Sequence, residues 1–240
     1  MNRRDRQVVL AGVGIAILTV GMMSVCSSGT GLRDTPCRQN DAGTVTDIDG
    51  NEYRTARIGT QVWMAENLRV THYRDGTAIP RVSDSEAWSN ARAGAYCPPE
   101  GDSVASNAVY GLLYNFSAVS DSCLLCPEGW HVPAAAEWRT LIGHLGGEAV
   151  AGGKMKDTVA GLWRLRVRGT TNESGFSALP AGGRGRIGVA SDVGYFATWW
   201  SSTPYDSAYA WHWGLYPDNS GIRSNPGHKA SGFSVRCMKD

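Results

Sequence analysis

The chain has 240 residues and carries 23 Lys and Arg against 22 Asp and Glu, so its formal net charge is +1. This length suits one or two domains with a substantial hydrophobic core. Near neutrality argues against nucleic acid as a partner, because phosphate binding requires a basic surplus. Thirty glycines and nine tryptophans predict a compact, loop-rich fold with many turns and few long helices.

The N-terminus has the charge layout of an export signal. Residues 1–7 are basic, and residues 8–25 are apolar and uncharged. The positive-inside rule keeps such an N-terminus in the cytoplasm and exports the chain beyond the apolar segment. That segment, expected to be helical, is then a cleaved signal peptide, an uncleaved membrane anchor or a lipoprotein signal with Cys26 as the lipidated residue. Val25 fits the lipoprotein pattern poorly, whereas the small polar residues after Cys26 resemble a lipoprotein tether. We therefore expect an extracytoplasmic protein, at the cell surface or in the periplasm, either membrane-anchored or secreted.

Export makes disulfides permissible. The six cysteines are Cys26, Cys37, Cys97, Cys123, Cys126 and Cys237. Two of them form a C-x-x-C motif, but there is no second such motif and no histidine pair with ligand spacing, so no metal site is expected. The four cysteines from Cys97 onward allow three pairings, and spacing alone does not choose among them.

The first elements of the exported part are turns and short strands. Residues 26–43 are small and polar and are predicted to be a linker, so the folded domain is expected over residues 44–240. Two alternating runs around Asp49-Gly50 predict a β-hairpin. Ser83 and Glu86 have the spacing of a capping box and predict a short helix. The apolar, aromatic residues 110–119 predict a buried strand or a turn of helix.

The main helix is predicted to begin near Pro133, a residue tolerated at a helix start. Its apolar stripe has the spacing i, i+3, i+4, i+7 and consists of Trp138, Leu141, Ile142 and Leu145. Gly146-Gly147 is its natural stop. Short strands come next between turn residues, within residues 161–167, 175–182, 195–203, 209–216 and 232–240. One main amphipathic helix, a short helix and many short antiparallel strands, after an N-terminal apolar helix, indicate an α+β fold.

Several strings carry a family likeness. They are "DIDGNEYRTARIGTQVWMAENL", "YRDGTAIP", "YGLLYNFSAV", "CPEGWHVPAAAEW", "TNESGFSALPAGGR", "WWSST" and "GFSVRCMKD". In order and spacing they resemble the Fibrobacter succinogenes major paralogous domain across about residues 44–240. That family is similar to the C-type-lectin-like fold, which formylglycine-generating enzymes and the variable proteins of diversity-generating retroelements share. The resemblance implies a secreted or surface domain with this fold, and it implies no particular reaction.

The resemblance also carries expectations about single residues. Ala134-Ala135 replaces the family's usual Thr-Asp pair, so the helix start is expected to be weaker by about 1 kcal/mol. In C-type-lectin-like folds the chain ends close to the start of the main helix, which implies a Cys126–Cys237 disulfide and leaves Cys97 to pair with Cys123. The alternatives are Cys123–Cys237 with Cys97–Cys126, or a Cys123–Cys126 bridge that would constrain little. Cys26 and Cys37 remain for lipidation, for each other or for another chain.

Catalysis is not expected. No G-x-S-x-G motif occurs, no helix is predicted after the glycine-rich residues 182–188, and no free pair of cysteines like that of the copper-dependent formylglycine-generating enzymes can be placed. Asp47 and Asp49 are more simply explained as turn residues, as are Asp218 and Asn219. No catalytic residue and no cofactor is predicted, with a structural calcium ion left open.

The strongest candidate for a binding region is residues 199–229, because Trp, Tyr and Arg are typical of binding hot spots and also suit sugar stacking. In the retroelement variable proteins this C-terminal region is the ligand-binding face. Alternation predicts that Trp211 and Trp213 lie in the core and that His212 and Tyr216 face outward. The candidate ligand-binding residues are Tyr205, His212, Tyr216, Asp218, Asn219, Arg223 and His228.

We expect a membrane-tethered surface domain for binding or adhesion, with an unknown protein or glycan as its partner, the membrane as a second partner through the N-terminal segment, and no nucleic acid. The alternatives are a structural subunit of a surface layer or filament, and a divergent oxidase or hydrolase of the formylglycine-generating-like fold.

Overall fold

The computed structural model describes residues 40–99, 104–159, 161–164 and 169–240. The predicted basic region, the apolar segment, Cys26 and Cys37 therefore lie outside the described residues. The folded unit, Arg38–Asp240, has the mixed α+β class that the sequence predicts. No helix among the described residues has the length and apolar character needed to cross a membrane.

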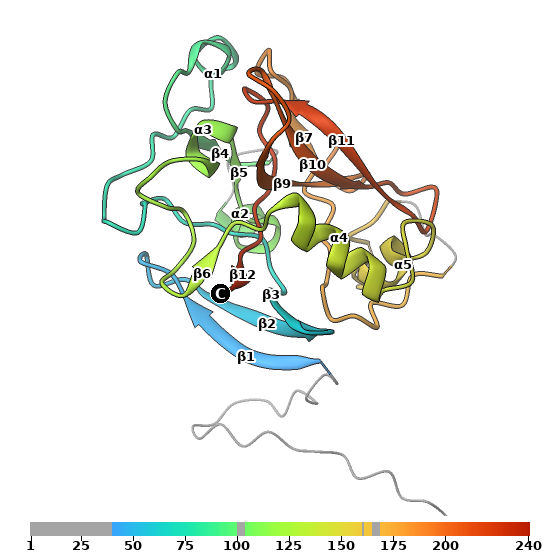
Figure 1. Cartoon of the computed structure of the whole chain (residues 1–240). Coiled ribbons are helices and arrows are strands. Elements are labelled where there is room, and N and C mark those ends of the chain that lie inside the picture. The colour runs from blue at the N-terminus through green and yellow to red at the C-terminus, as the bar shows by residue number, and fades with distance from the viewer. Residues whose placement is uncertain (1–39, 100–103, 160, 165–168) are drawn as a thin grey trace, which may run out of the picture. The chain divides into compact units, whose positions relative to one another are not determined.

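The larger sheet is antiparallel and has the strand order β1-β2-β3-β12-β6 (Figure 1). Its strands are β1 (Asp41–Thr46), β2 (Glu52–Ile58), β3 (Gln61–Met64), β12 (Met238–Lys239) and β6 (Trp130–His131). The predicted hairpin around Asp49-Gly50 joins β1 to β2, with Thr46 opposite Glu52 and Gly50 at φ +80°. Strand β1 begins at Asp41, three residues before the expected start of the domain.

The second sheet is antiparallel and has the order β11-β10-β9. It consists of β9 (Ala197–Pro204), β10 (Tyr209–Leu215) and β11 (Ile222–His228). Two strand pairs complete the described β-structure, β4 (Tyr96–Cys97) with β5 (Leu113–Tyr114) and β7 (Gly183–Arg184) with β8 (Ala190–Ser191).

The described helices are α1 (Ser85–Asn90), α2 (Val104–Tyr110), α3 (Phe116–Val119), α4 (Ala135–His144) and α5 (Ala151–Met155). They are more numerous than the one main and one short helix expected. Helix α1 is the predicted short helix, but its cap is Asp84 instead of Ser83, because the Asp84 carboxylate accepts the Ala87 N–H at 2.8 Å. Residues 110–119 form both the strand and the helical turn that were predicted as alternatives.

Helix α4 organises the core between the two sheets (Figure 1). The apolar stripe predicted from its spacing is buried. Trp138 stacks on Trp213 of β10, with ring centroids 5.4 Å apart, and its edge meets Trp63 of β3 at 4.9 Å. A second core cluster surrounds Trp200 and Cys237. The three-stranded sheet therefore contacts a core cluster on each of its faces.

The start of α4 is stabilised from outside the helix. Ala134 offers no side-chain cap, as expected from the sequence. The Glu137 carboxylate instead accepts the Ala134 N–H at 2.7 Å, and the Thr203 hydroxyl of β9 accepts the Ala135 N–H at 2.9 Å. The missing cap is thus offset by a hydroxyl that is distant in sequence. The helix ends at the predicted glycines, both with positive φ, where Gly147 N–H donates to Ile142 O.

Candidate functional site

The structure separates the predicted ligand-binding residues into three places. The register of β10 with β11 pairs Tyr209 with His228 and Trp211 with Pro226 on one face of the sheet. It pairs His212 with Asn225 and Gly214 with Arg223 on the opposite face. Tyr216, Asp218 and Asn219 lie in the turn that joins the two strands. The seven predicted residues therefore do not form one surface.

His212 is the clearest correction. Its side chain was expected to face solvent, but the residue is only 8 % exposed. The imidazole packs against Phe233 at 4.6 Å and against Trp200 at 6.2 Å between ring centroids. Burial lowers the pKa of His212 to about 4, so the ring is neutral in the fold. Alternation predicted outward exposure, whereas the segment containing Phe233 covers this second face of β10 as well.

The β10–β11 turn is held by a buried lysine. Lys156, which follows α5, donates to the backbone carbonyls of Tyr216 and Asn219, and its ammonium lies 5.0 Å from the Trp163 ring centroid. Burial lowers the pKa of Lys156 to about 8, although Asp218 acts in the opposite direction. The Asn219 amide donates to the Asp218 carboxylate at 2.6 Å. These residues lie in the turn that the sequence predicts.

A row of rings remains exposed at the far end of the first face. It comprises Tyr205, Tyr209, Trp211 and His228, and we name it the aromatic strip. Tyr205 and Tyr209 are 55 % and 40 % exposed, while Trp211 and His228 are partly buried. The rings meet edge to face, Tyr205 on Trp211 at 5.1 Å and Tyr209 on His228 at 5.4 Å. These pairs fix the orientation of rings that solvent still reaches.

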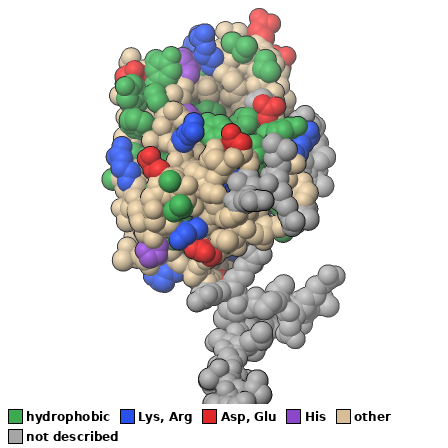
Figure 2. All heavy atoms as spheres, turned by 90° about the vertical axis from the view of Figure 1, so that its right-hand side faces the viewer, with side chains coloured by type: hydrophobic (Ala, Val, Ile, Leu, Met, Phe, Trp, Pro, Cys, Tyr) green, Lys and Arg blue, Asp and Glu red, His purple; other side chains and the backbone are tan. Residues whose placement is uncertain are grey.

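The aromatic strip exists because α4 covers only part of this face. Trp213, Leu215 and Ile222 lie on the same face and are buried in the core cluster that contains α4. Helix α4 begins beside Thr203, near the end of β9, and the core cluster that contains it buries Trp213 but only partly buries Trp211. Figure 2 shows the side on which β11 and α5 lie, where hydrophobic side chains gather in separate patches among charged ones.

Trp211 was predicted to lie in the core, and Tyr209 was not among the seven predicted ligand-binding residues. Alternation was correct about the face, since both residues share it with Trp213. Alternation carried no information on how far along β10 the helix α4 covers this face. The only available signal was the position of the two residues near the start of β10, close to the polar hairpin residues Asp206 and Ser207.

The disulfide predicted from the resemblance is present. Cys126 and Cys237 are bonded across a sequence separation of 111 residues. The predicted Cys97–Cys123 bridge is absent, and both thiols are free. Cys97 is buried in a third core cluster with Trp88 and Leu113. Cys123 packs at the edge of the cluster that surrounds Trp200 and Cys237. A disulfide requires two sulfurs in direct contact, and the two clusters hold these residues apart.

Neither free thiol has the environment of a reactive cysteine. Burial raises the pKa of Cys97 to about 11. A hydrogen bond to the Asp75 carboxylate, together with Asp121, raises the pKa of Cys123 to about 11. A nucleophilic cysteine needs a lowered pKa, so both are predominantly protonated at neutral pH. Among the described residues, no group of three His, Cys, Asp or Glu side chains is placed to hold a metal ion.

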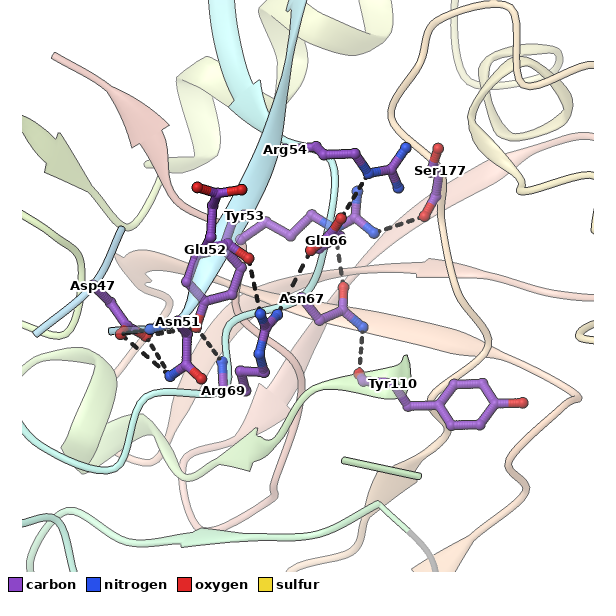
Figure 3. A network of polar contacts seen from close by, with 11 residues as sticks. Asp47, Asn51, Glu52, Tyr53, Arg54, Glu66, Asn67, Arg69, Tyr110 and Ser177 are labelled. Atoms are coloured by element: carbon purple, nitrogen blue, oxygen red, sulfur yellow. Dashed lines mark hydrogen bonds and ion pairs between the residues drawn. The ribbon is translucent and has the colours of Figure 1, made fainter. Parts of the chain in front are cut away.

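A network of polar contacts around Arg236 and Asn67 holds several segments of the chain together (Figure 3). Arg236 is completely buried, and its guanidinium donates to the Asn67 side chain at 2.9 Å and to the carbonyls of Phe176 and Ser177. Asn67 in turn donates to the Tyr110 carbonyl at 2.8 Å. Burial lowers the pKa of Arg236 to about 9. Because its N–H groups are directed at backbone carbonyls, Arg236 joins loops and faces no open space.

The network continues into the β1–β2 turn. The Asp47 carboxylate accepts the Tyr53 hydroxyl at 2.6 Å and the Asn51 amide at 2.9 Å, and the Tyr53 hydroxyl accepts the Arg69 N–H (Figure 3). The described pocket next to this turn is lined by Thr46, Asp47, Ile48, Arg74, Leu125, Cys126, Pro127 and Glu128. Arg74 donates to three carbonyls of the lining loop, those of Cys126, Pro127 and Trp130. The guanidinium of Arg74 is therefore used in holding the fold.

Comparison with protein families supplies the remaining finding. The model of the Fibrobacter succinogenes major domain matches residues 56–239, a range that contains α4, the disulfide and the aromatic strip. Comparison with curated proteins and with solved structures gives no match. The matched range covers well over half of the chain, and the chain therefore belongs to the Fibrobacter succinogenes major domain family.

Proposed function

We propose that the chain is an exported surface domain of C-type-lectin-like fold that binds a protein or glycan partner through the aromatic strip. The observation that carries this proposal is a set of oriented, solvent-accessible rings at one end of a sheet face whose other end is buried in the core. Exposed Tyr and Trp supply large contact area with little side-chain entropy to lose, which is why they are frequent in binding surfaces.

The disulfide supports the location in this proposal. Structural disulfides persist in oxidising compartments, so Cys126–Cys237 indicates an extracytoplasmic domain. We further propose that residues 8–25 tether the domain to the membrane, which would present the aromatic strip to partners outside the cytoplasm. The role proposed is binding and not catalysis. The thiols of Cys97 and Cys123 are protonated at neutral pH. Lys156 and Arg236 donate hydrogen bonds to backbone carbonyls.

The test uses the exported full-length chain on the surface of a bacterial host. Retention on target cells and on isolated cell envelopes is measured for the wild type and for a Tyr205→Ala, Trp211→Ala double variant. We expect retention to fall at least tenfold, as for the loss of hot-spot residues. The control is Tyr195→Ala, because Tyr195 lies outside the aromatic strip and its exposed fraction of 38 % is similar to the 40 % of Tyr209.

Equal retention of the double variant and the wild type would remove the aromatic strip as the binding surface. A wild-type chain that binds no cell or envelope, and instead forms ordered polymers that the double variant cannot form, would replace the proposal with a structural subunit. Sedimentation of the purified chain in detergent at increasing concentration distinguishes these outcomes.

A further inference from the structure

We propose that the aromatic strip is a platform for a neutral carbohydrate chain, which stacks its sugar rings on Tyr205, Trp211 and Tyr209. This inference rests on the proposed binding function and names the chemical class of the ligand.

The geometry of the rings suits sugars. The C–H groups on one face of a pyranose carry partial positive charge, and an aromatic ring face carries the negative part of its quadrupole. Tyr205 is perpendicular to Trp211, with an interplanar angle of 89°, and Tyr209 is perpendicular to His228 at 83°. Each pair fixes one ring against another before any ligand arrives. Trp211 and Tyr209 are two residues apart on one strand, about 7 Å, which is of the order of one hexose unit.

The aromatic strip also offers hydrogen-bonding groups. His228 Nδ1 accepts the Ala230 N–H at 3.2 Å, which leaves Nε2 as the ring nitrogen that can donate to a sugar hydroxyl. The two tyrosine hydroxyls both donate and accept. A surface that combines stacking faces with a few such groups matches the mixed apolar and hydroxylated character of a sugar ring.

The charge around the aromatic strip favours a neutral ligand. None of its four members is Lys, Arg, Asp or Glu, and Trp211 lies opposite Pro226. Two charged residues next to the aromatic strip hydrogen-bond to the backbone of the β9–β10 hairpin. Asp206 accepts the N–H groups of Ala208 and Tyr209, and Lys229 donates to the carbonyls of Asp206 and Ser207. The aromatic strip itself therefore offers no Lys, Arg, Asp or Glu side chain to an acidic or basic polymer.

The extent of the aromatic strip argues against a protein partner. A fully accessible tyrosine offers roughly 200 Å², so the exposed fractions of Tyr205 and Tyr209 with the partly buried rings provide on the order of 300 Å². A stable protein interface needs about 800 Å² per partner. The neighbouring edge strand β11 contains Pro226, which lacks an N–H group and opposes the addition of a peptide strand.

The aromatic strip is open, so the ligand is expected to be a chain that lies along the surface. The described pocket is formed by the β1–β2 turn and residues 125–128 and includes none of the four members. A small metabolite would be enclosed by a pocket, whereas a polysaccharide can gain contacts from successive units.

The test measures binding of the full-length chain in detergent to cellohexaose and mannohexaose by calorimetry, with a polygalacturonate oligomer as the anionic comparison. We expect saturable binding of at least one neutral hexasaccharide. Tyr205→Ala should weaken that binding at least tenfold, whereas Tyr205→Phe should stay within about threefold because it keeps the ring. Tyr195→Ala should bind as the wild type does.

The fluorescence of Trp211 provides a second measurement of binding, independent of calorimetry. Sugar stacking should change tryptophan fluorescence on titration, and Trp211→Phe should abolish most of that change. Unfolding curves confirm that each variant is folded. No saturable binding of either neutral hexasaccharide, or equal binding by wild type and Tyr205→Ala, overturns the carbohydrate assignment. If the Tyr205→Ala, Trp211→Ala variant still loses envelope retention in that case, the binding surface stands and only the ligand class is wrong.

Discussion

Two halves of one sheet face differ in what covers them. Trp213 and Trp211 lie on the same strand and point to the same side, two residues apart. Trp213 is 1 % exposed and stacks on Trp138 of α4, whereas Trp211 is partly exposed and contacts Tyr205. The helix accounts for the difference. A strand pattern specifies a face, and the placement of the next layer decides which part of that face becomes core and which becomes surface.

The disulfide fixes the chain just ahead of α4 and should give the largest effect. Cys126→Ser with Cys237→Ser removes the bond that closes 111 residues, and the chain-entropy model assigns about 4–5 kcal/mol to a loop of that length. Denaturant unfolding of oxidised wild type and the double variant measures the loss. Cys97→Ser is the control, because that thiol is free. A loss below about 1 kcal/mol would mean that the bond does not constrain the unfolded chain.

Trp213 should contribute more to the free energy of unfolding than Trp211 does. Trp213→Ala leaves a cavity against Trp138 and should lower the free energy of unfolding by about 3–5 kcal/mol. Trp211→Ala should lower it by no more than about half as much, since solvent already reaches that side chain. Parallel denaturant titrations decide this. Equal losses would show that the two halves of the face are buried alike in solution.

The other face of β10 gives a pH-dependent comparison. His212 has a pKa of about 4 in the fold because of burial, against an ordinary value of 6.5. The unfolded chain therefore binds a proton that the folded chain resists, and stability falls as pH decreases from 6.5 to 4, by about 3 kcal/mol in total. His212→Gln should remove this part of the pH dependence.

Melting curves of both proteins at several pH values measure the difference in slope. Subtracting the variant's curve isolates His212 from other groups that titrate nearby. Burial alone would lower the pKa of His131, but the Asp240 and Glu137 carboxylates outweigh it and raise the pKa, so His131 stabilises the fold at low pH instead. Identical pH profiles for wild type and His212→Gln would contradict the burial of His212.

The start of α4 is stabilised by the hydroxyl of Thr203. Thr203→Val keeps the shape of the side chain but loses the oxygen that accepts the Ala135 N–H, and should lower the free energy of unfolding by about 1 kcal/mol. Ala134→Ser in the same background should recover part of that loss by supplying a local cap. If Ala134→Ser has no effect, a local side-chain cap does not replace the hydroxyl of Thr203.

The exposed rings should matter least for stability. Tyr205→Ala and Tyr209→Ala should each change the free energy of unfolding by under about 0.5 kcal/mol, as exposed positions usually do. Thermal melts of both variants provide the measurement. A loss above about 2 kcal/mol at either tyrosine would place it in the core and remove it from the aromatic strip.

Local patterns predicted local features well. The spacing of Trp138, Leu141 and Ile142 located α4, and Asp49-Gly50 located the first hairpin, because both signals depend on neighbouring residues. The Cys126–Cys237 bond came from the family resemblance, since spacing allowed three pairings. Membership of the family was recognised from motif order, and the family match bears this out.

Features that depend on distant segments were not accessible in this way. The burial of His212 results from Phe233, and the cap at Ala135 comes from Thr203. The free state of Cys97 and Cys123 reflects their positions in different core clusters. No pattern within β10 indicated where α4 begins above it, so the predicted binding site included a core histidine and omitted two of the four rings of the aromatic strip.

The disulfide has a consequence for the limited proteolysis of this domain. The aromatic strip lies within residues 205–228, between Cys126 and Cys237 in the chain. A single cut anywhere in that interval leaves two pieces that are still joined covalently through the sulfur atoms. The C-terminal piece, which carries the aromatic strip when the cut precedes it, cannot diffuse away from the rest. Limited proteolysis at a surface loop would therefore nick the protein without shedding its rings into the medium.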